Sequence, residues 1–451
     1  MELSSIKRVY LVGIGGIGMS GLARYFHHLG CMVCGYDKTP TDLTADLQNE
    51  GMKIIFEDRS DLIPESFQTP DEETLLIYTP AIPKDSAIVN YFKSRGFTLY
   101  KRSQVLGIIS QTMFTVAVAG THGKTTTSTM VAHILKASGN DCSAFLGGLS
   151  ANYHSNVLYG KNNVVVVEAD EYDRSFLTLH PDVAIITSMD ADHLDIYGDH
   201  AHLKESFKMF ASQIKPGGTL IRKKGLPIDT GYTYAVDSEA DAKATNIKIE
   251  NGDFYFDFAN KDVRIANIKM GIAGLHNIEN AVAAIEAALI LSVPADAIKN
   301  ALASFAGVKR RFEYIVKNER HIYIDDYAHH PEELKATIRS VKRLYPDKKL
   351  TTIFQPHLYT RTRDFVEGFA EALDLSDELI ILDIYPAREL PIAGVDSEMI
   401  LERMELENKR CISKNDVVNV IRQEKPALLL TVGAGDIDTL VQPLKQVLQN
   451  A

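Results

Sequence analysis

Seven consecutive residues, Gly120–Thr126 (Gly-Thr-His-Gly-Lys-Thr-Thr), have the types and spacing needed to bind a polyphosphate. The glycines let backbone N–H groups converge on phosphate oxygens, Lys124 supplies a positive charge, and a threonine hydroxyl can reach Mg²⁺. The apolar run 114–119 predicts a strand in front of this loop. The helix expected over 125–137 points its positive end at the same phosphates. The segment therefore predicts a nucleoside triphosphate site.

Carboxylates follow two later apolar runs. Glu168 closes the run 164–168 and opens the string Glu-Ala-Asp-Glu-Tyr-Asp, and the string Asp-Ala-Asp-His-Leu-Asp at 190–195 follows the run 183–187. Carboxylates at the carboxyl ends of strands beside a phosphate loop can hold Mg²⁺, with an occasional imidazole as a further ligand. For the second string, a zinc site and simple capping of a helix by Asp are the alternatives.

A second glycine turn stands near the N-terminus. Residues 13–18 read Gly-Ile-Gly-Gly-Ile-Gly after a predicted strand, and Asp37 follows at the end of the next strand. This spacing fits a dinucleotide fingerprint, so a nicotinamide-dependent oxidoreductase is one hypothesis. Any nucleotide diphosphate uses the same backbone physics, and a separate triphosphate loop in the same chain favours chemistry other than redox.

Histidine and arginine follow two strands in the last third of the chain. The string 325–331 reads Asp-Asp-Tyr-Ala-His-His-Pro, and the string 355–364 reads Gln-Pro-His-Leu-Tyr-Thr-Arg-Thr-Arg-Asp. Pro331 suits the first turn of a helix. Histidine and arginine at strand ends can grip an anionic substrate, and solvated capping loops are the alternative.

The elements that must position these residues form three α/β units, over 1–111, 112–308 and 309–451. Strands are expected at 8–12, 32–36, 75–78, 98–100, 114–119, 164–168, 183–187, 322–324, 350–354, 379–382 and 427–431, and helices at 18–29, 125–137, 277–291, 331–344 and 362–373. Short alternating segments are expected at 244–258 and 263–270. Open sheets of this kind bind ligands at the carboxyl ends of their strands, where the strings above lie.

Composition restricts the class of protein. The 451 residues carry a formal net charge of −11 and 45% apolar residues, which argues against a nucleic-acid or membrane-surface partner. The N-terminus lacks a signal-peptide pattern, and no apolar stretch has the length of a membrane span. Cys31 and Cys34 have no second pair with which to form a zinc site, so we expect buried thiols in a reducing cytoplasm.

The order of motifs resembles the Mur ligase family. Its motifs here are Gly-x-Gly-Gly-x-Gly-Met-Ser-Gly, Ala-Gly-Thr-His-Gly-Lys-Thr-Thr, Glu-Ala-Asp-Glu, Asp-His-Leu-Asp, His-Asn-x-x-Asn-Ala, Arg-Arg-Phe, Asp-Asp-Tyr-x-His-His-Pro and Phe-Gln-Pro-His-x-x-Thr-Arg-Thr. The resemblance spans nearly the whole chain and is strongest to the branch that adds L-alanine to UDP-N-acetylmuramate. It implies an N-terminal Rossmann-like domain for the UDP-sugar, a central P-loop ATPase domain, and a C-terminal Rossmann-like α/β domain that closes over the amino acid.

The resemblance also implies roles for individual residues. Contacts to ATP fall to Gly120, Thr121, His122, Gly123, Lys124, Thr125, Thr126, His276, Asn277, Asn280, Arg311 and Asp325. Contacts to the other substrates fall to Gly15, Gly16, Ile17, Gly18, Asp37, Thr79, Ala81, Arg102 and His357. Thr125, Glu168 and His193 would bind Mg²⁺. Catalytic roles would fall to Lys124, His193, His329 and Arg361.

The implied reaction is phosphorylation of the lactyl carboxylate by ATP, followed by attack of the alanine amine on the acyl phosphate. The implied protein is a monomer or weak homodimer. Leu358 stands where some members of the family carry Arg, and Lys204 and Lys208 are not expected to be carbamylated. A relative that reattaches a recycled tripeptide to the same UDP-sugar is the nearest alternative, and a non-catalytic nucleotide switch is a further one.

Overall fold

The computed structural model describes residues 3–190, 197, 199–250, 253–387 and 389–449. The chain divides into two compact units. The first comprises Met1–Ala244, Phe258–Ile265 and Asn280–Leu302, and the second comprises Thr245–Asp257, Ala266–Glu279 and Ala303–Ala451. Within them the strands form three sheets, which carry the three groups of motifs.

The N-terminal sheet has five parallel strands in the order β3-β2-β1-β4-β5. Its strands are β1 (Arg8–Val12), β2 (Met32–Tyr36), β3 (Lys53–Ile55), β4 (Thr74–Tyr78) and β5 (Leu99–Lys101), and its helices are α1 (Ile17–His28), α2 (Asp42–Asn49), α3 (Ala87–Ser94) and α4 (Arg102–Thr112). The parallel α/β fold expected for this region is confirmed.

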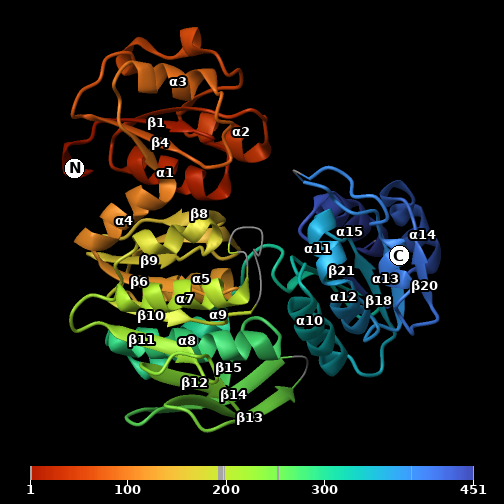
Figure 1. The fold of residues 1–451 in the computed structure, drawn as a ribbon. Coiled ribbons are helices and arrows are strands. Elements are labelled where there is room, and N and C mark those ends of the chain that lie inside the picture. The colour runs from red at the N-terminus through yellow and green to blue at the C-terminus, as the bar shows by residue number, and fades with distance from the viewer. Residues whose placement is uncertain (1–2, 191–196, 198, 251–252, 388, 450–451) are drawn as a thin grey trace. The chain divides into compact units, whose positions relative to one another are not determined.

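Alternation along β1 explains the layers of this sheet. Val9 and Leu11 lie in one buried cluster with Leu22 of α1, whereas Tyr10 lies in another cluster with Phe92 of α3. Successive side chains of a strand point to opposite faces, so each face needs its own helical cover. Figure 1 shows α1 and α3 on the two sides of β1 and β4.

The central sheet has ten strands in the order β15-β14-β13-β12-β11-β10-β6-β9-β7-β8. The strands are β6 (Phe114–Ala119), β7 (Ser143–Ser150), β8 (Ser155–Leu158), β9 (Val164–Glu168), β10 (Val183–Ile186), β11 (Thr219–Lys223), β12 (Tyr232–Val236), β13 (Ala242–Glu250), β14 (Asp253–Ala259) and β15 (Arg264–Lys269). Its helices are α5 (Lys124–Ala137), α7 (His200–Ser212), α8 (Leu275–Ile290) and α9 (Ala295–Ser304), with the 3₁₀ helix η4 (Tyr172–Thr178). The strand β6 lies between β10 and β9 and is parallel to both, so their carboxyl ends meet at one edge.

The C-terminal sheet has six strands in the order β16-β17-β21-β18-β19-β20. The strands are β16 (Glu313–Lys317), β17 (Ile322–Asp326), β18 (Leu350–Phe354), β19 (Glu378–Ile381), β20 (Lys409–Cys411) and β21 (Leu428–Val432), and the helices are α10 (Pro331–Leu344), α11 (Tyr359–Asp364), α12 (Val366–Leu373), α13 (Glu398–Leu401), α14 (Val417–Glu424) and α15 (Val441–Gln449). The β16–β17 pair is antiparallel, and the other neighbouring strands of this sheet pair in parallel. One face packs on α14 and α15 through Ile353, Ile421 and Leu444, and the ring of Phe354 meets that of Phe369 of α12.

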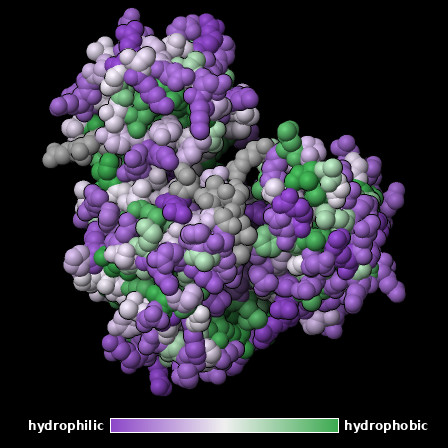
Figure 2. Space-filling view, viewed as in Figure 1, coloured by the Kyte–Doolittle hydropathy of each residue, from purple (hydrophilic) through white to green (hydrophobic). Residues whose placement is uncertain are grey.

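The prediction of a single helix over 362–373 is wrong. The structure has two helices, which begin at Tyr359 and Val366 and are separated at Phe365. All four cysteines are free thiols. In the described part of the chain, every helix is too short or too polar to span a membrane. On the face shown in Figure 2, hydrophilic side chains predominate and hydrophobic ones form small groups.

Candidate active site

The loop 120–126, which the sequence predicts to bind phosphate and which we call the phosphate-binding loop for that prediction, lies at the carboxyl end of β6 as expected. Gly120 and Gly123 have φ values of +135° and +81°, a region that glycine enters at little cost. Gly123 is the N-cap of α5 and offers no side-chain cap, so the first N–H groups of this helix have no such partner. Amides and a helix end arranged in this way favour an anion.

Two side chains that directly follow β10, those of Thr187 and Ser188, fix the shape of this loop. The hydroxyl of Ser188 accepts from the His122 N–H at 2.7 Å and lies 2.8 Å from the Thr121 hydroxyl. Thr187 donates to the carbonyl of Ala119 at 3.1 Å, and a Cβ on Gly120 would lie 2.0 Å from its hydroxyl. Sequence reasoning missed both residues. The available signal was the Thr-Ser pair at 187–188, directly after a buried strand.

Lys124 is held by a buried carboxylate that the sequence did not single out. Its Nζ lies 2.9 and 2.8 Å from the two oxygens of Glu171, and it donates to the Gly120 carbonyl at 2.6 Å. The Glu171 side chain is fully buried. Burial opposes the charge on Lys124, but the carboxylates of Glu171, Asp170 and Glu168 outweigh it and raise the Lys124 pKa. The loop therefore presents a lysine that stays protonated.

The Glu168 carboxylate lies at the end of β9, beside the strand that leads into the loop. Its Oε2 accepts from the Gly147 N–H at 3.0 Å, and a Cβ on Gly147 would lie 2.2 Å from both of its oxygens. Thr125 is buried at the start of α5. His193, the third predicted metal ligand, lies outside the described residues. Within the described residues, three or more His, Cys, Asp or Glu side chains do not gather closely enough to hold a metal by themselves.

The N-terminal glycine turn is shaped by contacts that exclude side chains. A Cβ on Gly15 would lie 2.8 Å from Asp37, and one on Gly18 would lie 2.3 Å from the Arg102 Nε. Asp37 accepts from the Gly15 N–H at 2.7 Å. The α1 helix begins at Ile17 with Gly16 as an N-cap that has no side-chain cap. The turn therefore offers amides to an anion, as the phosphate-binding loop does.

Two further predicted residues, Thr79 and Arg102, border this turn, and a third, Ala81, follows Thr79 closely in the chain. Thr79 lies next to Gly13, where a Cβ would meet its methyl group at 2.5 Å, and Ala81 is exposed two residues later. Burial lowers the pKa of Arg102 although Asp170 and Glu168 oppose this effect. Arg102 therefore lies beside the glycine turn and interacts electrostatically with the carboxylates of Glu168 and Asp170.

The predicted residues of α8 divide between the two units. Asn280 lies against the phosphate-binding loop, because a Cβ on Gly123 would meet its Oδ1 at 2.7 Å. His276, in the other unit, packs beside the ring of Phe312 at 6.0 Å between centroids. Burial and the charge of Arg311 lower the pKa of His276 to about 4. Asn277 donates to the carbonyl of Ala273 at 2.6 Å.

The two aspartates that end β17, Asp325 and Asp326, both accept hydrogen bonds from other groups of the protein. Asp325 is fully buried and binds Arg310 at 3.1 Å and the Thr431 hydroxyl at 2.5 Å. Asp326 accepts from the N–H of Phe312 at 2.6 Å, and burial raises its pKa to about 6. The Arg311 guanidinium lies 5.1 Å from the centre of the Tyr327 ring. These contacts give Asp325 a structural partner, and its predicted contact with ATP stays a prediction.

The structure brings His329 and His357 together at the carboxyl edge of the C-terminal sheet. Their ring centres are 6.1 Å apart. The His329 Nδ1 lies 2.9 Å from the Tyr327 carbonyl, and the ring of His357 stacks on Tyr385 at 5.8 Å. Arg361 lies on α11 and is 9% exposed. The arrangement places imidazoles at a sheet edge where open α/β folds bind ligands.

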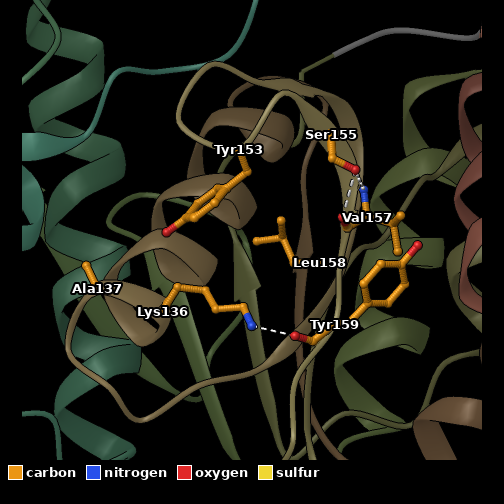
Figure 3. A pocket seen from close by; sticks show the side chains of 7 residues that line it. All are labelled: Lys136, Ala137, Tyr153, Ser155, Val157, Leu158 and Tyr159. Carbon is orange, nitrogen blue, oxygen red and sulfur yellow. Dashed lines mark hydrogen bonds between the residues drawn. The ribbon is translucent and has the colours of Figure 1, made fainter. Parts of the chain in front are cut away.

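A cavity of about 630 Å³ in the first unit lies away from these groups. Lys136, Tyr153, Leu158 and Tyr159 are among its lining residues (Figure 3). Lys136 lies about 18 Å along α5 from Lys124. Its ammonium group already binds Asp141 and the Tyr159 carbonyl, which accepts from it at 2.5 Å. None of the predicted site residues lines this cavity, so it is not the candidate active site.

Three segments of the chain match one protein family. Residues 8–113 match the Mur ligase family, catalytic domain; residues 118–288 match the Mur ligase middle domain; and residues 310–437 match the Mur ligase, glutamate ligase domain. Together they cover most of the 451 residues.

Curated relatives are similar over their full length. The UDP-N-acetylmuramate–L-alanine ligase of Flavobacterium psychrophilum is 48% identical to this chain. The alignment covers 99% of this chain and 99% of that protein. The enzyme of the same name from Parabacteroides distasonis is 49% identical, and the alignment covers 99% of this chain and 98% of that protein. Among solved structures, the UDP-N-acetylmuramate-alanine ligase of Thermotoga maritima has a TM-score of 0.83 and 27% identity, over 98% of this chain and 99% of that one. A murein peptide ligase from Psychrobacter arcticus has a TM-score of 0.68 and 24% identity, over 99% of both chains.

Proposed function

The chain belongs to the Mur ligase family, and from this premise we propose that it joins L-alanine to UDP-N-acetylmuramate at the expense of ATP. The observation that carries the proposal is the identity of 48–49%, over almost the entire length, with relatives that bear the name of this activity. The solved structure with a TM-score of 0.83 bears the name of the same activity. The murein peptide ligase, at 24% identity, shares the fold.

The proposed reaction has two steps. The lactyl carboxylate attacks the γ-phosphorus of ATP, so that a carboxyl O–P bond forms and ADP leaves. The amine of L-alanine then attacks the acyl carbon, the amide C–N bond forms, and phosphate leaves with its electron pair while the amine loses a proton. Activation is needed because a free carboxylate is a poor electrophile.

The loop 120–126 supplies the charge for the first step. Its amides and the start of α5 face the triphosphate, and Lys124 neutralises charge as the phosphoryl group moves. Ser188 supports this role, because it fixes the loop by hydrogen bonds from His122 and with Thr121. Contacts from Asn280, His276, Asn277 and Arg311 to the remainder of ATP are part of the same proposal.

We propose Mg²⁺ as the metal, held by Thr125, Glu168 and His193. A buried hydroxyl and a carboxylate beside the loop are oxygen donors of the kind that this ion prefers. Bound Mg²⁺ would neutralise phosphate charge. The chain's own contribution is to orient Glu168, which Gly147 does through its N–H and through the space left by its absent side chain.

The remaining residues would hold the two other substrates. The turn 13–18 would bind the diphosphate of the UDP-sugar, with Asp37, Thr79, Ala81 and Arg102 around it. His329 and His357 would face the reacting carboxylate and amine. The guanidinium of Arg361 matches the acceptor carboxylate as a two-pronged donor.

Phosphate release with UDP-N-acetylmuramate and each of the twenty amino acids tests the proposal. We expect L-alanine to be the best acceptor, with glycine and L-serine used at reduced efficiency. One methyl group separates alanine from glycine by only about 1–3 kcal/mol. Faster ligation of L-Ala-γ-D-Glu-meso-diaminopimelate than of free L-alanine would instead identify a recycling enzyme.

A further inference from the structure

The loop that follows β19 contains Tyr385, which is hydrogen-bonded to the segment 356–358 that follows β18. Tyr385 donates its N–H to the Pro356 carbonyl at 2.8 Å and accepts from the Leu358 N–H at 2.9 Å. His357 and Tyr385 form a parallel bridge, and their rings are stacked with 18° between planes. Tyr385 therefore fixes the backbone on both sides of His357.

The same loop supplies a cap to α11. Both oxygens of Glu389 bind Thr360: one accepts from its N–H at 3.0 Å and the other from its hydroxyl at 2.5 Å. The N-cap of α11, Leu358, has no side-chain cap of its own. A carboxylate at a helix start satisfies N–H groups and is favoured by the helix dipole. The cap thus comes from a residue 29 positions further along the chain.

The segment needs these external contacts because it is intrinsically weak. With six residues, α11 is much shorter than a helix that is stable alone. Leu358 has a φ of +70°, which is strained for a residue with a branched side chain and persists only when its surroundings impose it. Arg361 lies on the first turn of this helix, one residue beyond the capped Thr360.

From these contacts we propose that Glu389 is a positioning residue for the amino-acid acceptor. It fixes the first turn of α11 and so the guanidinium of Arg361 that grips the acceptor carboxylate, while Tyr385 fixes His357. This inference rests on the proposed function, which places the acceptor at Arg361. It makes Tyr385 and Glu389 determinants of acceptor affinity that leave ATP and UDP-sugar binding unaffected.

Steady-state kinetics of the full-length enzyme with each of the three substrates varied in turn test this inference. Glu389→Ala should raise the KM for L-alanine by at least about 10-fold, with the KM values for ATP and UDP-N-acetylmuramate changed by less than about twofold. Thr360→Val, which removes only the hydroxyl donor and keeps the shape, should raise the L-alanine KM by about threefold. Thr360→Ser, which restores the donor, should recover most of this loss.

Thr351→Val is the matched control. The Thr351 hydroxyl also donates to a glutamate, Glu378, at 3.3 Å, but at the start of β18 instead of its carboxyl end. This variant should keep the wild-type KM for L-alanine. An unchanged L-alanine KM in Glu389→Ala, or an equal rise in all three KM values, overturns the inference. If Glu389→Ala does not fold, an unchanged L-alanine KM in Thr360→Val overturns it. A wild-type enzyme without alanine-dependent phosphate release overturns the proposed function instead.

Discussion

Lys124 carries the charge on which the proposed phosphoryl transfer depends. Lys124→Ala should lower turnover by at least about 10²–10³, the scale for loss of a preorganised electrostatic contact. It should also lower the melting temperature, because Glu171 would keep a buried charge without its partner. Phosphate release and differential scanning calorimetry measure the two effects.

A second substitution separates these effects. Adding Glu171→Gln to Lys124→Ala should recover the melting temperature but not the turnover. Lys215→Ala is the matched control, because Lys215 also binds a carboxylate, Asp182, at 2.8 Å and a carbonyl at 2.7 Å. Near-wild-type turnover in Lys124→Ala would remove the loop from the mechanism.

Gly147 leaves the space that the Glu168 carboxylate occupies. Gly147→Ala would put a methyl group 2.2 Å from both carboxylate oxygens, so the carboxylate must move. We expect the Mg²⁺ concentration for half-maximal activity to rise by about 10-fold or more, as for other losses of support around a metal ligand.

Titration of activity with Mg²⁺ measures this change. Gly21→Ala is the control, since its added Cβ would meet its nearest neighbour only at 3.6 Å. Identical Mg²⁺ curves for Gly147→Ala and wild type would argue that Glu168 does not bind the metal.

The α5 helix carries the phosphate-binding loop and contains a buried histidine. His133 donates from Nε2 to the Ala301 carbonyl, 3.0 Å away, and its Nδ1 lies 3.0 Å from the Tyr153 hydroxyl. Burial lowers the pKa of His133 below its ordinary value of 6.5, and the hydrogen bond to Ala301 opposes this only in part. The folded protein therefore binds this proton less readily than the unfolded chain.

The contribution of neutral His133 to the free energy of unfolding should therefore be complete above about pH 6.5. It should be lost as the pH falls below this value, because the unfolded chain then takes up the proton first. His133→Gln removes the titrating group, so its melting temperature should fall less than that of wild type between pH 7.5 and pH 5.5. Calorimetry at a series of pH values measures the two slopes. His27→Gln, on the exposed side of α1, controls for loss of a histidine from a helix. Equal slopes for wild type and His133→Gln would contradict the prediction.

Three sheets organise the whole molecule, and we propose domains over 1–111, 112–308 and 309–451. The fragment 309–451 should fold alone, because β16–β21 pair only with one another among the described strands and their core lies within residues 316–448. Cooperative thermal unfolding by circular dichroism would show this. The fragment should release no phosphate from ATP, since the loop 120–126 is absent.

A shorter fragment is the matched control. Residues 309–426 end before β21 and so lack this strand and the C-terminal helix α15, but β21 lies between β17 and β18 at the centre of the sheet. This fragment should remain unfolded. A random-coil spectrum for 309–451 would show that the proposed boundary is misplaced.

The sequence predicted those elements whose signals are local. The bounds of β1, β2, β18 and α10 agree with the expected ones, because apolar runs and Pro331 mark them within a few residues. The prediction of one helix over 362–373 was wrong for the opposite reason: the signal that starts the first helix is not local. Its first turn begins at Tyr359 because Glu389 caps it from a distance, which no pattern near that turn indicates.

The sequence alone also predicts the residues proposed to carry the chemistry. Glycines, Lys124 and a hydroxyl between a strand and a helix predict a phosphate-binding loop from local sequence alone. Only the tertiary structure decided which carboxylate faces Lys124, which glycine makes room for Glu168, and which residue caps α11. Lys124 and Glu171 are 47 residues apart, and Thr360 and Glu389 are 29 apart. Sheet topology brings such partners together, and a residue's type and neighbours do not record which distant side chain the sheet will place beside it.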